Sequence, residues 1–178
     1  MTTAGFRLRA FRSDESEFLL ERLRHWMSEA VAESEAHFRK ETEKRVAHSG
    51  GWSEEGALDY AIDVDGRLAG AVRVGSKEFL LPPGVYELGI EFYADGDRGR
   101  GLGTQALRRF IPEVFDHGAI RVQGHTHVEN KPMIRLFERY GFVREGVLRH
   151  YFPMPERSGD VALYGLIRPD YEQRRSEF

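Results

Sequence analysis

The chain has 178 residues, 40% hydrophobic and 31% charged, which is the composition and length of one ordinary globular domain. Its 26 basic and 29 acidic residues give a net charge of −3, which argues against a protein that coats nucleic acid. It has no cysteine, so disulfides, thiolate zinc sites and a cysteine nucleophile are excluded. No apolar run approaches the roughly 20 residues of a membrane span, and the first ten residues lack the apolar region of a secretory signal. We therefore expect a cytoplasmic protein.

In chain order the pattern predicts a strand (6–11), two helices (15–48, breaking near Met27), a hairpin (57–64 and 67–74), a strand (85–94), a helix (101–117), a strand (119–128), a helix (131–140) and two strands (142–151 and 160–167). Asp65-Gly66 marks the hairpin turn, because this dipeptide accepts positive φ at both central positions. The order of elements predicts a single mixed α/β domain over residues 1–178, with a core at 6–171 and a short tail at 172–178.

The most informative segment is DRGRGLGT at residues 97–104, which follows a predicted strand and opens a helix. Successive backbone N–H groups at a helix N-terminus suit an anion such as a pyrophosphate, and Arg98 and Arg100 add positive charge. The segment lacks the Gly-Lys-Ser/Thr end of a P-loop and the G-x-G-x-x-G spacing of a dinucleotide site. Taken alone, it could equally be a glycine-rich loop with incidental arginines.

Four motifs follow one another in order: ELGIEF at 87–92, RGRGLGT at 98–104, Asn130 with Ile134 and Leu136, and YGFVREG at 140–146. Together they resemble the GNAT superfamily of acetyl-CoA-dependent N-acetyltransferases, whose Q/R-x-x-G-x-G/A signature matches Arg98, Gly101 and Gly103. The later part is most similar to the ribosomal-protein N-terminal alanine and serine acetyltransferases. The resemblance implies a GNAT-like domain with a twisted mixed sheet of six to seven strands, about four helices, and two splayed strands that form the acetyl-CoA cleft.

The same resemblance implies which residues bind acetyl-CoA. Backbone groups of Glu91, Phe92 and Tyr93 are expected to meet the pantetheine arm. The pyrophosphate is expected to lie against the N–H groups of Arg98, Gly99, Arg100, Gly101, Leu102, Gly103 and Thr104. Asn130 matches an asparagine that contacts the cofactor in relatives, and it is equally suited to be a helix N-cap. No metal is expected, because the histidine pair 125 and 127 has no identifiable third ligand.

Two residues are candidates for the general base that amine acetylation requires. Glu87 lies 14 residues before Gly101, the spacing of a strand glutamate that acts as base in some relatives, and its alternative is an ordinary half-exposed strand position. His125 lies five residues before Asn130, where some protein-acetylating relatives carry a glutamate, and its alternative is surface or packing. An imidazole titrates near neutral pH.

The general acid of many relatives is a tyrosine seven residues after the asparagine, where this chain has Phe137. Tyr140 is three residues further on, about 60° short of a full helical turn, which makes it a doubtful replacement. Water is the other proton donor available to a leaving thiolate.

The acceptor pocket of relatives is shaped by the first two helices and a late loop, here 153–159. Trp26, Trp52, Tyr151 and Asp160 are therefore candidate substrate contacts, although core packing explains the tryptophans equally well. The expected function is acetyl transfer from acetyl-CoA, by direct attack in a ternary complex, to a primary amine of a protein N-terminus or small molecule. We expect a monomer or homodimer that binds neither nucleic acid nor a membrane. A non-catalytic acyl-CoA-binding module is the alternative.

Overall fold

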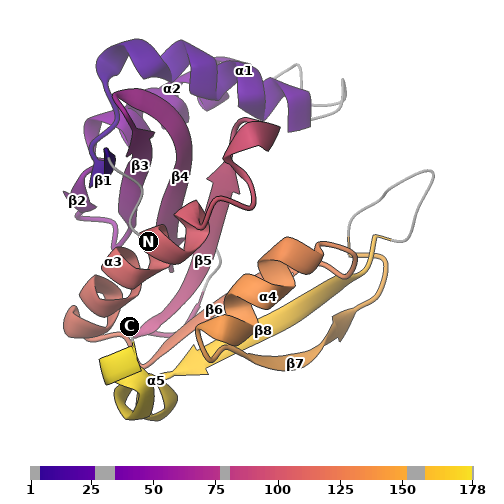
Figure 1. The fold of residues 1–178 in the computed structure, drawn as a ribbon. Coiled ribbons are helices and arrows are strands. Elements are labelled where there is room, and N and C mark those ends of the chain that lie inside the picture. Colours follow the sequence, from indigo (N-terminus) through magenta and orange to yellow (C-terminus); the bar gives the residue numbers. More distant parts are fainter. Residues whose placement is uncertain (1–4, 27–34, 77–80, 152–158, 178) are drawn as a thin grey trace.

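The computed structural model describes residues 5–26, 35–76, 81–151 and 159–177, with backbone alone for 23–26 and 177. This part of the chain contains an eight-stranded sheet in the order β1-β3-β4-β5-β6-β8-β7, with β2 paired to β3 (Figure 1). The strands are β1 (Phe6–Arg9), β2 (Gly51–Trp52), β3 (Leu58–Val64), β4 (Arg67–Gly75), β5 (Val85–Phe92), β6 (Arg121–His127), β7 (Val143–Leu148) and β8 (Val161–Ile167). The α-helices are α1 (Ser16–Trp26), α2 (Glu35–Ala47), α3 (Leu102–Asp116), α4 (Lys131–Arg139) and α5 (Arg168–Arg174). The mixed α/β fold is confirmed, with β2 and α5 in addition to the predicted elements.

The hairpin between β3 and β4 forms as its turn dipeptide predicts. Asp65 and Gly66 have φ angles of 53° and 84°, the left-handed values of a two-residue hairpin turn. Val64 and Arg67 pair on either side of them, so the register of the hairpin begins at the turn itself.

The two faces of the β3–β5 part of the sheet carry different cores. Val72 and Leu88 point to one face and pack with Phe110 on the apolar side of α3. Ala71 points to the other face, where it packs with Leu19 of α1 in a smaller cluster. The sheet therefore lies between α3 on one side and the α1–α2 pair on the other (Figure 1).

β5 and β6 are the parallel pair of this sheet, and they separate early. Residues 85–87 of β5 pair with residues 121–123 of β6. Beyond these residues β5 continues to Phe92 and β6 to His127, and the two strands no longer pair with each other. Figure 1 shows the two strands diverging from this point, with α3 beside β5 and α4 beside β6. The splayed strands implied by the family resemblance are confirmed.

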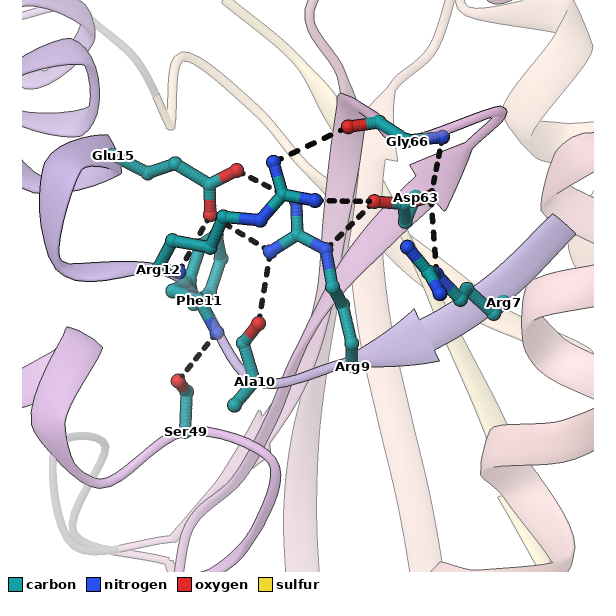
Figure 2. A network of polar contacts seen from close by, with 9 residues as sticks. All are labelled: Arg7, Arg9, Ala10, Phe11, Arg12, Glu15, Ser49, Asp63 and Gly66. Carbon is teal, nitrogen blue, oxygen red and sulfur yellow. Dashed lines mark hydrogen bonds and ion pairs between the residues drawn. The ribbon is translucent and has the colours of Figure 1, made fainter. Parts of the chain in front are cut away.

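A buried carboxylate joins the edge strand β1 to the hairpin (Figure 2). Asp63, whose side chain is fully buried, accepts hydrogen bonds from Arg7 Nε at 3.2 Å, Arg9 Nε at 2.7 Å and the Gly66 N–H at 2.9 Å. Arg9 also donates to both carboxylate oxygens of Glu15, which precedes α1, at 2.8 and 2.6 Å. Burial alone would raise the pKa of Asp63, but the hydrogen bonds from Arg9, Gly66 and Arg7 hold it below its ordinary value.

Candidate active site

The glycine-rich turn opens α3 with an N-terminus that no side chain caps. Gly99 and Gly101 have φ angles of 73° and 77°, which side chains disfavour, and Gly101 is the N-cap residue. Within the described residues, no acceptor meets the backbone N–H groups of residues 101–104. These N–H groups and the positive end of the helix dipole suit a phosphate group. The residues present therefore fit the pyrophosphate of an acyl-CoA.

Both arginines of the turn are paired with acidic side chains. Arg98 lies 2.8 Å from Asp95, and Arg100 lies 3.4 Å from Asp97. The backbone N–H of Arg98 donates to the Asp95 carbonyl at 3.0 Å. Contrary to expectation, this N–H is therefore used within the turn, and the N–H groups that could bind a pyrophosphate come after Arg98 in the chain. Buried Asp97 accepts hydrogen bonds from Arg67 at 2.9 and 2.7 Å, which lower the pKa of Asp97 and hold the turn against β4.

α4 lies against the start of α3. A Cβ at Gly103 would lie 2.9 Å from Leu136 Cδ2, so a side chain at this position would require the Leu136 side chain to move. Asn130 caps α4, because its Oδ1 accepts the Met133 N–H at 3.3 Å. The Asn130 Nδ2 donates to Thr126 Oγ1 at 3.0 Å. The N-cap role considered for Asn130 is confirmed, and its contact with a cofactor stays a prediction.

Neither Phe137 nor Tyr140 offers a hydroxyl for the role of general acid. Phe137 is fully buried and stacks on Tyr164, with ring centroids 5.1 Å apart. Tyr140 donates its hydroxyl to the Thr104 carbonyl, and burial raises the pKa of Tyr140 to about 12. Tyr140 therefore links α4 to α3 and does not replace the missing acid.

The two candidates for the general base form one hydrogen-bonded pair where β5 and β6 separate. Glu87 Oε1 and His125 Nδ1 lie 2.7 Å apart. Glu87 is 7% exposed, so it is not the half-exposed strand residue considered as its alternative. Its other oxygen, Oε2, accepts a hydrogen bond from Gln123 Nε2 at 3.0 Å. Because an ionised carboxylate can only accept, the neutral imidazole beside it carries its proton on Nδ1 and its basic lone pair on Nε2.

A pocket of about 540 Å³ lies under α1 and α2, on the face of β5 that carries Glu87. Glu91, which lines this pocket, pairs across the strands with Ala71, whose side chain faces α1. The β4–β5 register is uninterrupted over residues 87–92, so alternation places Glu87, Gly89 and Glu91 on this same face. Glu87 and Glu91 therefore lie on the same face of β5.

The lining of the pocket combines apolar and acidic groups. Its basic side chains already have partners, in the pairs Lys44–Glu55, Arg45–Asp59 and Arg73–Asp59 and in the stacking of Arg22 on Tyr93. Within the described residues, Glu41, Glu54 and Glu91 line the pocket without a basic side chain at ion-pair distance. The pocket thus places three carboxylates that have no ion-pair partner among the described residues beside the apolar surface of Leu19, in a lining that carries five acidic side chains and four lysine or arginine side chains.

The structure brings one of the four candidate acceptor contacts to the Glu87–His125 pair. The Tyr151 ring meets the His125 ring at a steep angle, with centroids 5.3 Å apart. Trp52 instead packs with the α3 core and stacks on His117 at 3.8 Å, so the structure gives it a packing role away from the pocket.

Asp160 has a structural contact in the connection between β7 and β8, where its Oδ1 accepts the His150 N–H at 2.8 Å, and its role as an acceptor contact stays a prediction. The side chain of Trp26 and residues 152–158 lie outside the described residues.

No role could be assigned to Gln123 from the sequence, although this residue lies on the same face of β6 as His125. The signal was the alternation of residues 121, 123, 125 and 127 along β6. The pairing of Gln123 with Glu87 on the neighbouring strand could not be predicted, because parallel strands that pair are far apart in the sequence.

The splayed strands, the uncapped glycine turn and the adjacent α4 define the fold class of acyl-CoA-dependent transferases. The chain belongs to the GNAT acetyltransferase family, whose acetyltransferase (GNAT) domain profile matches residues 6–143.

Two acetyltransferases are similar in sequence to part of the chain. The uncharacterized N-acetyltransferase p20 of Bacillus licheniformis is 29% identical over 87 residues, which are 48% of this chain and 46% of that protein. Mycothiol acetyltransferase of Clavibacter sepedonicus is 33% identical over 109 residues, which are 58% of this chain and 32% of that protein. The matches span less than half the length of these relatives.

Solved structures share the fold over nearly the whole chain. Spermidine N-acetyltransferase from Vibrio cholerae, in complex with CoA and spermine, has a TM-score of 0.73 at 21% identity and covers 96% of this chain and 99% of its own. RimL, a ribosomal L7/L12 α-N-protein acetyltransferase in complex with CoA, has a TM-score of 0.66 at 17% identity and covers 94% and 96%. At these identities the likeness concerns the fold.

Across the described parts of the chain, no helix combines the length and the apolar character that crossing a bilayer requires. The same residues contain no cluster of three or more histidine and acidic side chains that could hold a metal ion.

Proposed function

We propose that this protein transfers an acetyl group from acetyl-CoA to a primary amine, with Glu87 and His125 acting as one general-base unit. The observation that carries the proposal is their 2.7 Å hydrogen bond at the point where β5 and β6 separate. An amine is protonated at neutral pH and must lose a proton before it attacks, so a base at the acceptor position lowers the barrier.

Each member of the pair has a separate task. Glu87 accepts a hydrogen bond from the Nδ1–H group of His125 and so keeps the imidazole in the tautomer whose Nε2 is basic. His125 Nε2 takes the proton from the incoming ammonium group, directly or through one water. Glu87 then stabilises the imidazolium that forms, in the way a buried carboxylate supports a histidine base in other enzymes.

The remaining groups of the site bind and orient. The N–H groups of residues 101–104 hold the pyrophosphate, and backbone groups of residues 91–93 meet the pantetheine arm. Acetyl-CoA, when bound, supplies the carbonyl carbon that the amine attacks and the thiolate that leaves as the C–S bond breaks. Water protonates that thiolate, because Phe137 has no hydroxyl and that of Tyr140 is committed to Thr104.

The pocket under α1 and α2 supports a small, multiply charged amine as the acceptor. Glu91 lies four residues along β5 from Glu87, about 13 Å at the rise of a strand. Gly89 contributes no side chain between them, and the Cγ of its cross-strand neighbour Arg73 lies 3.6 Å from the position of an added Cβ. An amine that attacks beside Glu87 would place a second ammonium group near Glu91, Glu54 and Glu41. The fold neighbour that binds spermine and CoA supports the same acceptor class.

Release of the CoA thiol, measured with butylamine, spermidine and alanine- or serine-starting peptides, tests this proposal. Spermidine is expected to be the best acceptor. The variant with Glu41→Gln, Glu54→Gln and Glu91→Gln is expected to raise the KM for spermidine about tenfold, because three exposed ion pairs of about 0.5 kcal/mol each add to about 1.5 kcal/mol, and about 1.4 kcal/mol corresponds to a factor of ten. Glu43→Gln, an exposed change on α2 outside the pocket lining, is the control.

Two outcomes would redirect the assignment. Faster turnover of the peptides than of spermidine would identify a protein N-terminus as the acceptor. Binding of acetyl-CoA without thiol release in the presence of any amine would identify the protein as a non-catalytic acyl-CoA-binding module. This module is the alternative function because Phe137 stands where many relatives have the tyrosine that acts as general acid.

A further inference from the structure

A chain of polar side chains runs from the edge of the sheet to Glu87. Arg121 Nε donates to Gln123 Oε1 at 3.0 Å, and Gln123 Nε2 donates to Glu87 Oε2 at 3.0 Å. A guanidinium group has no acceptor, so Arg121 fixes which end of the Gln123 amide is oxygen and turns its NH₂ group toward Glu87. The carboxylate of Glu87 is therefore held on both sides, by Gln123 at one oxygen and His125 at the other.

The orientation of Arg121 is fixed in turn by Glu145 on β7. The two remaining guanidinium nitrogens donate to the two carboxylate oxygens of Glu145 at 2.7 and 2.5 Å. The hydrogen bonds from Arg121 lower the pKa of Glu145, so the pair is charged over the whole neutral range. The β7–β8 register shifts between Arg144 and Gly146, so Glu145 lies at an irregularity of the strand pairing.

Glycine at position 165 makes this ion pair possible. β8 lies between β6 and β7, and Gly165 lies directly beneath the Arg121–Glu145 contact. A Cβ there would lie 2.6 Å from Arg121 Nη1 and 2.6 Å from Glu145 Oε1. The φ of Gly165 is not in the left-handed region, so the absence of a side chain is needed for space and not for backbone conformation.

We propose that Gln123, oriented by the Arg121–Glu145 ion pair across Gly165, is a positioning residue that keeps Glu87 directed at His125. The proposal rests on the function of the Glu87–His125 pair proposed above. The Arg121 and Glu145 side chains are 21% and 36% exposed, and an ion pair at such exposure contributes little to stability. Its effect is expected in the geometry of the base.

The decisive variant is Gln123→Leu, which keeps the volume and removes the donor to Glu87. We expect kcat to fall about tenfold while the KM for acetyl-CoA stays within twofold, because binding does not involve this residue. Gly165→Ala and Glu145→Gln are expected to act in the same direction through Arg121. Gly146→Ala on β7 is the matched control, since a Cβ there meets no atom within 4 Å.

A double-mutant cycle separates positioning from a merely structural role. In a Glu87→Gln background, Gln123→Leu is expected to change kcat less than twofold, because its target is already lost. An equal fall in both backgrounds, or a Gln123→Leu enzyme within twofold of wild type, would overturn the proposal while leaving the acetyltransferase assignment intact.

A spectroscopic readout keeps the test independent of turnover. The ¹⁵N chemical shifts of neutral His125 are expected to report the Nδ1–H tautomer in the wild type and a mixture of tautomers in Gln123→Leu. Unchanged shifts in the variant would contradict the positioning role. If the wild-type protein releases no thiol with any amine, the function of the pair fails, and the tautomer measurement still decides whether Gln123 positions Glu87.

Discussion

Glu87 and His125, 38 residues apart in the chain, share a hydrogen bond of 2.7 Å between a buried carboxylate and an imidazole. Considered from the sequence, they compete for one catalytic role. In the structure they form one hydrogen-bonded pair, and we propose that the carboxylate orients the ring and the ring takes the proton.

The Glu87–His125 unit predicts non-additive losses. Glu87→Gln and His125→Ala are each expected to lower kcat about 100-fold, the lower end of the range for general-base catalysis, and the double variant no further than the worse single one. Steady-state kinetics with saturating acetyl-CoA measures this. His127→Ala, two residues along β6 on the same face, is the control and is expected to stay within twofold. Losses below threefold in both variants would mean that the amine loses its proton to solvent and that the protein acts by orientation.

The glycine turn predicts selective loss of acetyl-CoA binding. Gly101→Ala forces a side chain to a φ of 77°, which strains the turn at the start of α3, and Gly103→Ala places a Cβ 2.9 Å from Leu136 Cδ2, which displaces the Leu136 side chain beside the turn. Wild-type protein is expected to gain roughly 2.7 kcal/mol of stability at acetyl-CoA about 100 times its dissociation constant, and no gain from NADH or ATP. Thermal shift measures the difference. Gly96→Ala in the same loop, where a Cβ meets nothing within 4 Å, is expected to respond to acetyl-CoA as the wild type does.

The buried Asp63 predicts a pH-dependent loss of stability. Asp63→Asn removes a carboxylate that accepts from Arg7, Arg9 and Gly66, and it is expected to cost about 3 kcal/mol at pH 7. Because the pKa of Asp63 is lowered in the fold, its contribution is complete above about pH 4 and disappears as the pH falls through the folded value.

Urea unfolding at pH 7 and pH 3 measures this change. The difference between wild type and Asp63→Asn is expected to shrink at the lower pH, and a difference that grows would contradict the assigned direction. Asp65→Asn, an exposed change in the same hairpin, is the control, because asparagine also accepts the left-handed conformation of this position.

Removal of the Tyr140 hydroxyl is expected to lower the stability of the protein without lowering its catalytic rate. Tyr140→Phe removes the hydrogen bond to the Thr104 carbonyl and is expected to cost about 1 kcal/mol. The kcat is expected to stay within twofold, since a buried hydroxyl with a pKa of about 12 is committed to the contact between the helices. A fall of kcat by tenfold or more at temperatures where the variant is folded would assign Tyr140 to the chemistry after all.

Local features of this protein could be predicted because their causes lie within a few residues. The turn at Asp65-Gly66 follows from left-handed preference, the N-cap at Asn130 from a side-chain oxygen three residues before Met133, and the open N-terminus of α3 from the glycines around it. α5 was missed because Pro169 after a strand suggests an end, whereas in the first turn of a helix its missing N–H costs nothing.

The sequence by itself determined the family, the order of the elements, the glycine-rich turn before α3 and the two titratable side chains that we propose as the base. Tertiary structure decided how these side chains meet. The contact of Glu87 with His125 depends on a parallel register between strands separated by all of α3, and the Arg121–Glu145 pair depends on β8 lying between β6 and β7. Such contacts are set by packing and strand order across the whole sheet, which no local spacing in the chain encodes.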